Sequence, residues 1–200
     1  MKKALLGFLL TLLLIFPTFA YSGTPLDTVK ENVNKVLEVL RDPTLKGEPG
    51  RKVKKEKIRS ISEEMFDFTE LSKRSLGQSW KRFNPDQQEE FIKLFKLILE
   101  TAYADKITSY TDEKVTFKEE VILSKKAVEV PTTIVTKTSE IPINYRLLQE
   151  KERWKVYDVV IEGVSLVNNY RTQFREILAN KTPEALLDIL RKKVGEVGAI

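Results

Sequence analysis

The chain has 200 residues, with 34 Lys and Arg against 29 Asp and Glu, a formal charge of +5. It contains neither histidine nor cysteine. Their absence excludes disulfides, thiol nucleophiles, Ser-His-Asp triads and zinc sites of the Cys/His type. The length suits one domain, and any enzyme chemistry would depend on carboxylate, amine, phenol or hydroxyl groups.

The first 20 residues have the three parts of a secretory signal peptide. A basic start, Met1-Lys2-Lys3, precedes an apolar run over 4–16, and Thr18-Phe19-Ala20 forms a cleavage site of small residues. The run is shorter than the roughly 20 residues of a membrane-spanning helix, so an uncleaved anchor is the lesser alternative. We expect a signal peptide over 1–20 and one mature domain over 21–200.

Export also sets the expected surroundings. Without Lys2 and Lys3 the chain carries 32 basic against 29 acidic side chains, a formal charge of +3. A lipoprotein is excluded because no cysteine is present to carry the lipid. Nucleic acid is not an expected partner, since an exported protein seldom meets it.

The first half of the mature chain has helical periodicity. Apolar residues recur at helical spacing, and Asn84-Pro85 supplies an N-cap followed by proline at the first helical position. Gly77 is expected to end a short helix. The predicted helices cover 25–41, 51–66, 67–76 and 84–110, with a loop over 44–50.

From Lys114 the periodicity changes to alternation. Apolar residues alternate with polar ones in four runs, over 115–123, 128–134, 141–147 and 154–160. Helical spacing returns over 164–178 and again after Thr182-Pro183. The predicted fold class is α+β: a twisted four-stranded antiparallel sheet with helices against one face.

Two groups of residues could carry chemistry. Asp158 and Glu162 lie near the end of the last strand beside Tyr157, an arrangement that an isomerase or dehydratase could use for proton transfer. The alternative is that both carboxylates pair with Lys or Arg. The second group is a basic run that either binds an anionic partner or lipid headgroups or forms a solvated helix face; it comprises Lys46, Arg51, Lys52, Lys54, Lys55, Lys57 and Arg59.

Two blocks of the sequence resemble the MlaC family of periplasmic phospholipid-binding proteins, also called toluene-tolerance auxiliary components of an ABC transport system. One is the run from Trp154 to Arg171, WKVYDVVIEGVSLVNNYR, followed by Gln173 and Phe174. The other comprises Leu76-Gly77, Trp80, Pro85, Gln88, Phe91, Phe95, Leu99, Tyr103 and Tyr110.

The resemblance implies a non-enzymatic carrier that holds phospholipid as its cargo and needs no cofactor or metal. It implies a cone-shaped fold related to nuclear transport factors, with extra helices around an apolar cavity. In that family the carrier maintains outer-membrane lipid asymmetry. Its partners there are an inner-membrane MCE-domain protein of the ABC complex and an outer-membrane lipoprotein complex.

An apolar cavity predicts contacts from the helical and strand stripes. The predicted acyl-chain contacts are Trp80, Phe91, Phe95, Ile98, Tyr103, Val130, Ile134, Ile143, Tyr145, Leu147, Val160, Val164, Val167 and Phe174. Asn168 and Arg171 are predicted at the cavity mouth, because a guanidinium can bind a phosphate in bidentate fashion. For Arg171 the alternative is a surface ion pair.

Overall fold

A computed structural model describes residues 23–110 and 113–198. The predicted signal peptide lies outside them. The helices are α1 (Pro25–Arg41), α2 (Gly47–Met65), α3 (Phe68–Leu76), the 3-10 helix η1 (Gly77–Arg82), α4 (Pro85–Thr108), α5 (Leu166–Asn180) and α6 (Pro183–Gly198). The strands are β1 (Lys114–Phe117), β2 (Val121–Ser124), β3 (Ala127–Val135), β4 (Glu140–Glu150), β5 (Arg153–Ile161) and β6 (Val164–Ser165).

The predicted helices are present, and their caps explain where they begin. Thr24 and Asn84 each form a capping box with the third helical residue, Asp27 or Gln87, and a proline follows each cap. Gly77 ends α3 with a positive φ of 55°.

The loop expected over 44–50 is shorter than predicted, since α2 begins at Gly47. A Cβ at Gly50 would lie 2.3 Å from the carbonyl carbon of Leu45. Glycine there allows the new helix to pack directly on the preceding backbone, so it marks a close approach rather than a flexible turn.

The α+β class is confirmed, but the sheet has six strands instead of four. Its order is β1-β3-β4-β5-β6, all pairs are antiparallel, and β2 pairs with β3 on the same side as β1. The single strand expected over 115–123 is divided by the charged segment Lys118-Glu119-Glu120, and β6 is a two-residue strand where a helix was expected to begin.

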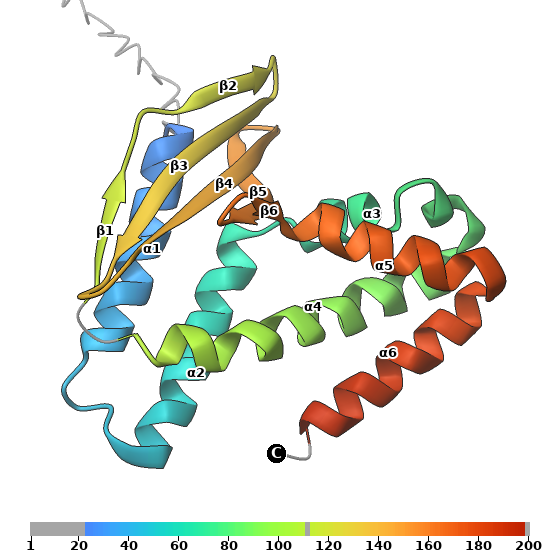
Figure 1. Cartoon of the computed structure of the whole chain (residues 1–200), viewed down its shortest axis with the longest axis horizontal. Helices are drawn as coiled ribbons and strands as arrows, with labels where there is room; N and C mark the ends of the chain where they lie inside the picture. The colour runs from blue at the N-terminus through green and yellow to red at the C-terminus, as the bar shows by residue number, and fades with distance from the viewer. Residues whose placement is uncertain (1–22, 111–112, 199–200) are drawn as a thin grey trace, which may run out of the picture.

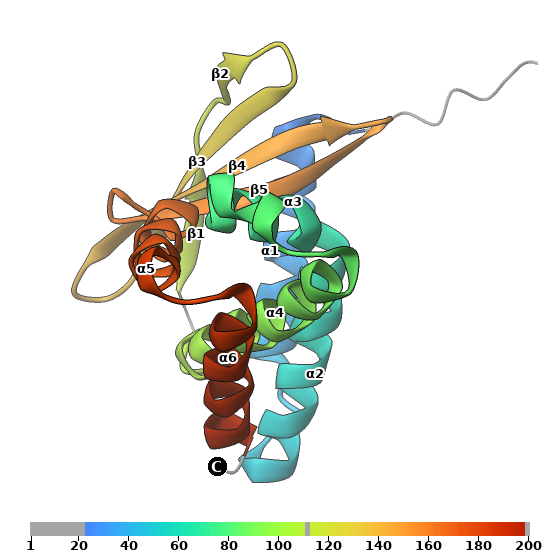
Figure 2. The same ribbon diagram turned by 90° about the vertical axis from the view of Figure 1, so that its right-hand side faces the viewer.

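The helices are arranged around one face and one end of the sheet (Figure 1). Helix α1 packs on β3, whereas α3 and α5 contact β5. Helix α4 contacts α2, α3 and α6 and crosses the molecule below the sheet. Figure 2 shows α6 on the side of the molecule away from β2.

Two groups of buried side chains fill this arrangement. The helical core consists of Leu71, Leu76, Phe83, Phe91, Phe95, Ile98, Leu99, Leu166, Val167, Phe174, Leu178, Leu186, Leu187 and Leu190. The sheet core consists of Val29, Met65, Val130, Leu147, Val156 and Val159. The apolar residues of the fold therefore form two cores, not one.

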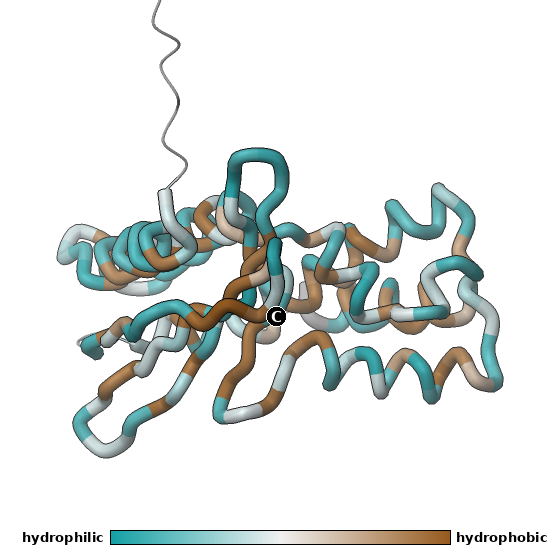
Figure 3. Tube along the Cα trace, turned by 90° about the horizontal axis from the view of Figure 1, so that it is seen from above, coloured by the Kyte–Doolittle hydropathy of each residue, from teal (hydrophilic) through white to brown (hydrophobic). Residues whose placement is uncertain are grey.

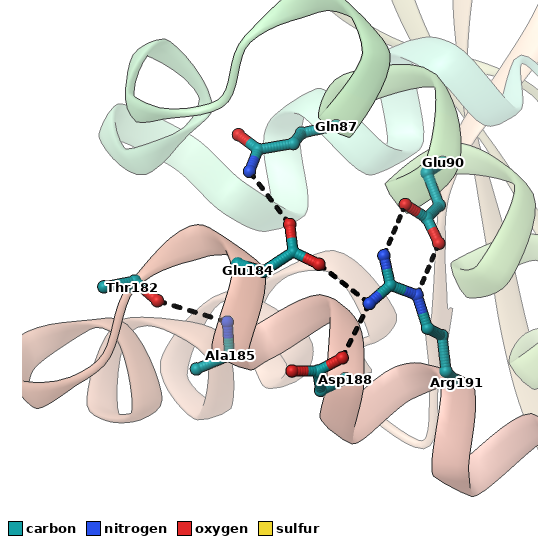
Figure 4. A network of polar contacts seen from close by, with 7 residues as sticks. All are labelled: Gln87, Glu90, Thr182, Glu184, Ala185, Asp188 and Arg191. Carbon is teal, nitrogen blue, oxygen red and sulfur yellow. Dashed lines mark hydrogen bonds and ion pairs between the residues drawn. The ribbon is translucent and has the colours of Figure 1, made fainter.

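A charged clamp holds α6 on α4 (Figure 4). The Arg191 guanidinium donates to both carboxylate oxygens of Glu90, at 2.7 and 2.8 Å, and also binds Glu184 at 2.8 Å and Asp188 at 2.6 Å. Hydrogen bonds from Arg191 hold the pKa of Glu90 and the pKa of Glu184 below their usual values. Opposite charges on two helices thus fix the outer wall of the helical core.

We expect Arg191→Met to lower the midpoint of thermal unfolding at low salt, because three carboxylates lose their shared cation. The loss should shrink in 1 M salt, where the Debye length falls to about 3 Å. It should also shrink as the pH falls below 4.5, the ordinary glutamate pKa, because the unfolded chain then binds protons first, and it should vanish below the lowered folded-state pKa, where the carboxylates are protonated in both states.

Lys192→Met is the matched control, because the Lys192 side chain is 79% exposed and, among the residues that the structure describes, pairs with Glu196 alone, at 3.9 Å. An equal loss in both variants, or a loss that is independent of salt, would contradict the clamp.

Candidate functional site

The predicted acyl-chain contacts are divided between the two cores. The helical core contains or adjoins Trp80, Phe91, Phe95, Ile98, Tyr103, Val167 and Phe174. The sheet core contains or adjoins Val130, Ile143, Tyr145 and Leu147. The predicted contacts therefore form two separate sets, one at the helical core and one at the sheet core.

The aromatic side chains of the helical core are close-packed. Phe91 and Phe95 have no exposed surface, and their ring centroids both lie 5.3 Å from that of Phe174 in edge-to-face geometry. Such contacts fill space at the density of an ordinary interior. In the described state these three residues contact one another, as core residues do.

Tyr145, on β4, marks a different environment. Burial raises the pKa of its phenol to about 12. The side chain is half-buried, packs against the sheet core, and its hydroxyl forms no hydrogen bond with any described residue. Tyr145 is therefore a polar group at the border of an apolar core, without a partner among the described residues.

Two tyrosines of the helices have the same character. Burial raises the pKa of Tyr103 on α4 and the pKa of Tyr170 on α5, and neither hydroxyl is hydrogen-bonded to a described residue. The nearby Tyr103 phenol also raises the pKa of Tyr170, after burial, which places the two side chains near each other. The Tyr170 ring packs edge-to-face on Phe95, with centroids 4.8 Å apart, so it forms the surface of the helical core.

Phe66 joins the two cores and was not among the predicted contacts. It packs against both, and its ring stacks on Phe68 with centroids 5.6 Å apart. An isolated bridge pairs Phe66 with Val156, and the Asp67 backbone N–H donates to the Val156 carbonyl at 2.9 Å. Its position at the end of a predicted helix was the only sequence signal available.

The remaining predicted contacts lie elsewhere. Ile134 is half-buried near the end of β3, and Val160 is buried but belongs to neither core. Val164 is 60% exposed in β6, directly after the turn at Gly163, so its side chain is open to solvent.

The two residues predicted at the mouth lie on the first turns of α5. Asn168 is exposed. Arg171 is half-buried, and its Nε donates to the Arg74 carbonyl at 2.8 Å, while its side chain packs over Gly77. The ion pair considered for Arg171 is not among the contacts of the described residues. Its guanidinium instead joins the end of α3 to α5.

Asp158 has a structural environment. It is 3% exposed, and its carboxylate accepts hydrogen bonds from the Ser165 hydroxyl at 2.7 Å and the Val167 backbone N–H at 3.0 Å. Arg146 pairs with it at 3.2 Å. The carboxylate therefore binds the N-terminus of α5 and a neighbouring strand, as an anion at a helix start does.

The proton-transfer group considered for Asp158 does not assemble around it. Glu162 is exposed in the turn, at a φ of 50°. Burial raises the pKa of Tyr157, whose ring lies 4.2 Å below the Arg74 guanidinium. Neither residue hydrogen-bonds to the carboxylate of Asp158 within the described chain.

Much of the basic run is paired with α4. Arg51 and Lys55 both bind Asp105 at 2.8 Å, and Arg59 lies 3.2 Å from Glu100. These ion pairs fasten α2 along α4, whereas Lys46, Lys52 and Lys57 remain exposed. Arg51, Lys55 and Arg59 therefore have a structural role, because their ion pairs hold α2 against α4.

Surface hollows of about 490 and 400 Å³ lie along α1 and α2. Their walls combine charged groups such as Glu38 and Asp42 with a few aliphatic side chains. None of the predicted contacts lines them. Among the described residues no cluster of acidic side chains has the arrangement of a metal site, and no helix is long and apolar enough to cross a bilayer.

Comparison with protein families decides the affiliation. The model described as "MlaC protein" matches residues 30–192, which is most of the chain. The chain belongs to the MlaC family. The matched range includes the helical core, the sheet core apart from Val29, and every predicted contact.

Solved structures and characterised relatives agree with the MlaC fold. A phospholipid-binding protein from Ralstonia solanacearum, solved in complex with a phospholipid, superposes with a TM-score of 0.77 at 24% identity, over 88% of this chain and 99% of that one. At this identity the likeness shows the fold.

Two relatives have names that describe their roles. The intermembrane phospholipid transport system binding protein MlaC of Haemophilus influenzae is 25% identical over 126 residues, 60% of this chain and 59% of that protein. The match thus spans less than two thirds of its length. The toluene tolerance protein ttg2D of Pseudomonas putida is 22% identical over 85% of this chain and 80% of its own.

Asp158→Asn tests the structural role of this carboxylate. We expect a loss of about 2–4 kcal/mol in the free energy of unfolding, because Arg146 and the start of α5 lose a buried anion. Urea denaturation followed by circular dichroism measures it.

Glu162→Gln is the control, and it should change stability by less than about 0.5 kcal/mol since Glu162 is exposed. If the Asp158→Asn protein is as stable as the parent, the structural role is contradicted. Asp158 would then again be a candidate for proton transfer.

Proposed function

We propose that this protein is a phospholipid carrier that encloses acyl chains between the sheet core and the helical core. The carrying observation is the division of the buried apolar residues into two cores, with Tyr145 at the border of the sheet core as a half-buried phenol that has no hydrogen bond to a described residue. Membership of the MlaC family supports the proposal, as do the phospholipid complex of the Ralstonia protein and the name of the Haemophilus relative.

The energetics of acyl chains explain why two cores suit this role. Each buried CH₂ is worth about 0.8 kcal/mol, so two chains with roughly 30 methylenes would lose on the order of 24 kcal/mol if left in water. A carrier must cover the tails almost fully, whereas the headgroup can stay in water. Two apolar walls that meet at one side can separate to admit tails without unfolding either wall.

The proposed tail contacts are ranked by where they lie. Ile143 and Tyr145 on the sheet side, and Tyr103 on the helical side, are partly buried side chains packed against the two cores, whereas Ile98 is buried within the helical core. Phe91, Phe95 and Phe174 form the packed interior behind them. We therefore expect the first set to touch cargo and the second to hold the wall in place.

The structure supports the isomerase or dehydratase hypothesis less than it supports a carrier. Its central carboxylate, Asp158, already binds three donors from Arg146, Ser165 and Val167. A carrier needs no catalytic residue, cofactor or metal. The arrangement of Asp158 therefore favours a non-enzymatic protein.

The cellular role follows from the family and the N-terminal sequence. We propose that the chain is exported to the periplasm and carries phospholipid between the two membranes, which would maintain the asymmetry of the outer membrane. Its proposed partners are an inner-membrane MCE-domain protein of an ABC complex and an outer-membrane lipoprotein complex.

Native mass spectrometry of protein recovered from a periplasm tests carriage. We expect about one phospholipid per chain, because one enclosed space can shield one set of tails, and solvent extraction should identify it. Repeated recovery without lipid, together with no uptake from vesicles, would refute the proposal.

Tyr145→Trp tests the location of the cargo. The larger ring should fill the space beside Tyr145 and weaken lipid binding on the order of tenfold, as overpacking of about 1–3 kcal/mol implies. Tyr110→Trp, two residues beyond the end of α4, is the matched control and should retain lipid. Thermal unfolding of both proteins separates a blocked space from a damaged fold, and equal occupancy in both would place the cargo elsewhere.

A further inference from the structure

Strand β2 exposes three consecutive large apolar side chains. Val121, Ile122 and Leu123 are 48%, 78% and 45% exposed, and Ser124 is exposed as well. Successive side chains of a strand point to opposite faces, so one packed face would bury every second residue. In β2 neither face is buried: Ile122 is largely exposed on one face, and Val121 and Leu123 are about half exposed on the other. Figure 3 shows the hydropathy along the chain from above the sheet.

The backbone of β2 is also only partly used. It pairs with β3 alone, through Val121 with Glu129 and Ile122 with Val128, and the register shifts before Ser124. Its other edge is unpaired in the described part of the chain. Runs of exposed apolar residues on a sheet edge are usually blunted or covered, so this surface indicates contact with an apolar phase.

The charges beside β2 indicate what that phase is. Lys125 and Lys126 follow directly in the turn, are exposed and form no ion pair with a described residue. The acidic residues lie at the other end of the strand, where Glu120 accepts a hydrogen bond from the Leu26 backbone N–H at 3.3 Å. An apolar segment ending in lysines matches the interface of a bilayer that contains anionic lipid.

Pairing with a second copy of the chain fits less well. The strand has four residues, carries a register shift, and ends in two lysines, all features that oppose edge-to-edge pairing. The views in Figures 1 and 2 place β2 at the end of the molecule opposite α6, so a flat surface can reach it.

We propose that β2 and the Lys125-Lys126 turn insert shallowly into the surface of membranes that contain anionic phospholipid. This surface is distinct from the proposed cargo space and goes beyond carriage. It gives the protein a direct membrane contact in addition to any protein partner.

The absence of native cysteine allows site-specific labelling. Ile122→Cys and Ile189→Cys would each carry an environment-sensitive nitrobenzoxadiazole label. Ile189, on α6, is also an exposed apolar residue, at 39%. With vesicles of phosphatidylglycerol and phosphatidylethanolamine, the label at 122 should shift to the blue and brighten, whereas the label at 189 should not. The two labelled proteins have the same N-terminal sequence, so any vesicle binding through that segment is the same in both.

Unlabelled variants measure the affinity for vesicles by co-sedimentation. Ile122→Ser should weaken binding on the order of tenfold, because a partly inserted isoleucine is lost. Replacing Lys125 and Lys126 with serine should weaken binding to anionic vesicles about fivefold per lysine and leave the weak binding to phosphatidylcholine unchanged. Ile189→Ser should bind like the parent, and all thermal midpoints should agree because these side chains are exposed.

Equal responses at positions 122 and 189, or no response at either, would overturn the proposal. So would a shift at 122 that appears without vesicles, rises with protein concentration and accompanies dimers in sedimentation, since β2 would then bind a second copy. Lipid occupancy of the same preparations, measured by mass spectrometry, tests carriage separately. A lipid-loaded protein whose β2 stays in water would refute only the membrane contact.

Discussion

The structure depends on one junction, where Phe66 packs against both the sheet core and the helical core. Helix α2 ends at Met65 inside the sheet core, and α3 begins at Phe68 beside the helical core. The intervening backbone is bound to β5 through the Asp67–Val156 hydrogen bond. Burying more apolar surface would merge the cores and stabilise the fold. Phe66 thus links two cores that each bury their own set of apolar side chains, while α3 and α5 also contact β5.

A row of charges orients the helices on the sheet. Glu129, Arg146 and Asp158 are direct neighbours across β3, β4 and β5, and their signs alternate. Buried ion pairs contribute little net stability, because desolvation offsets the attraction between the charges. Their value here is directional: Asp158 also binds Ser165 and the Val167 N–H, so the row fixes where α5 leaves the sheet. The position of Tyr170 on α5 follows from that anchor.

Local signals in the sequence were sufficient for most elements but not for the site. Asn84-Pro85 and Gly77 gave correct helix limits because caps depend on neighbouring residues only. The division of β1 from β2 was missed, since alternation continues on both sides of Lys118-Glu119-Glu120 and pairing with β3 decides the break. Periodicity placed Phe91 and Tyr103 on the same apolar face. Only the packing shows that Phe91 is enclosed by other rings while Tyr103 has an unbonded hydroxyl. Asp158 could not be assigned either, because its partners come from β4, β6 and α5.

The two proposals, enclosure of acyl chains and contact of β2 with a membrane, both concern how an acyl chain is kept out of water. An acyl chain avoids water at every stage of its path, so a carrier needs an apolar interior and also a way of approaching an apolar phase. The interior depends on walls that pack separately, which the two cores provide. The approach depends on apolar groups that the fold does not bury, and β2 holds them at the end of the sheet opposite α6. Exposed isoleucine at that position lowers solubility and adds nothing to the interior. Contact with a membrane gives this exposure a function that packing alone does not explain.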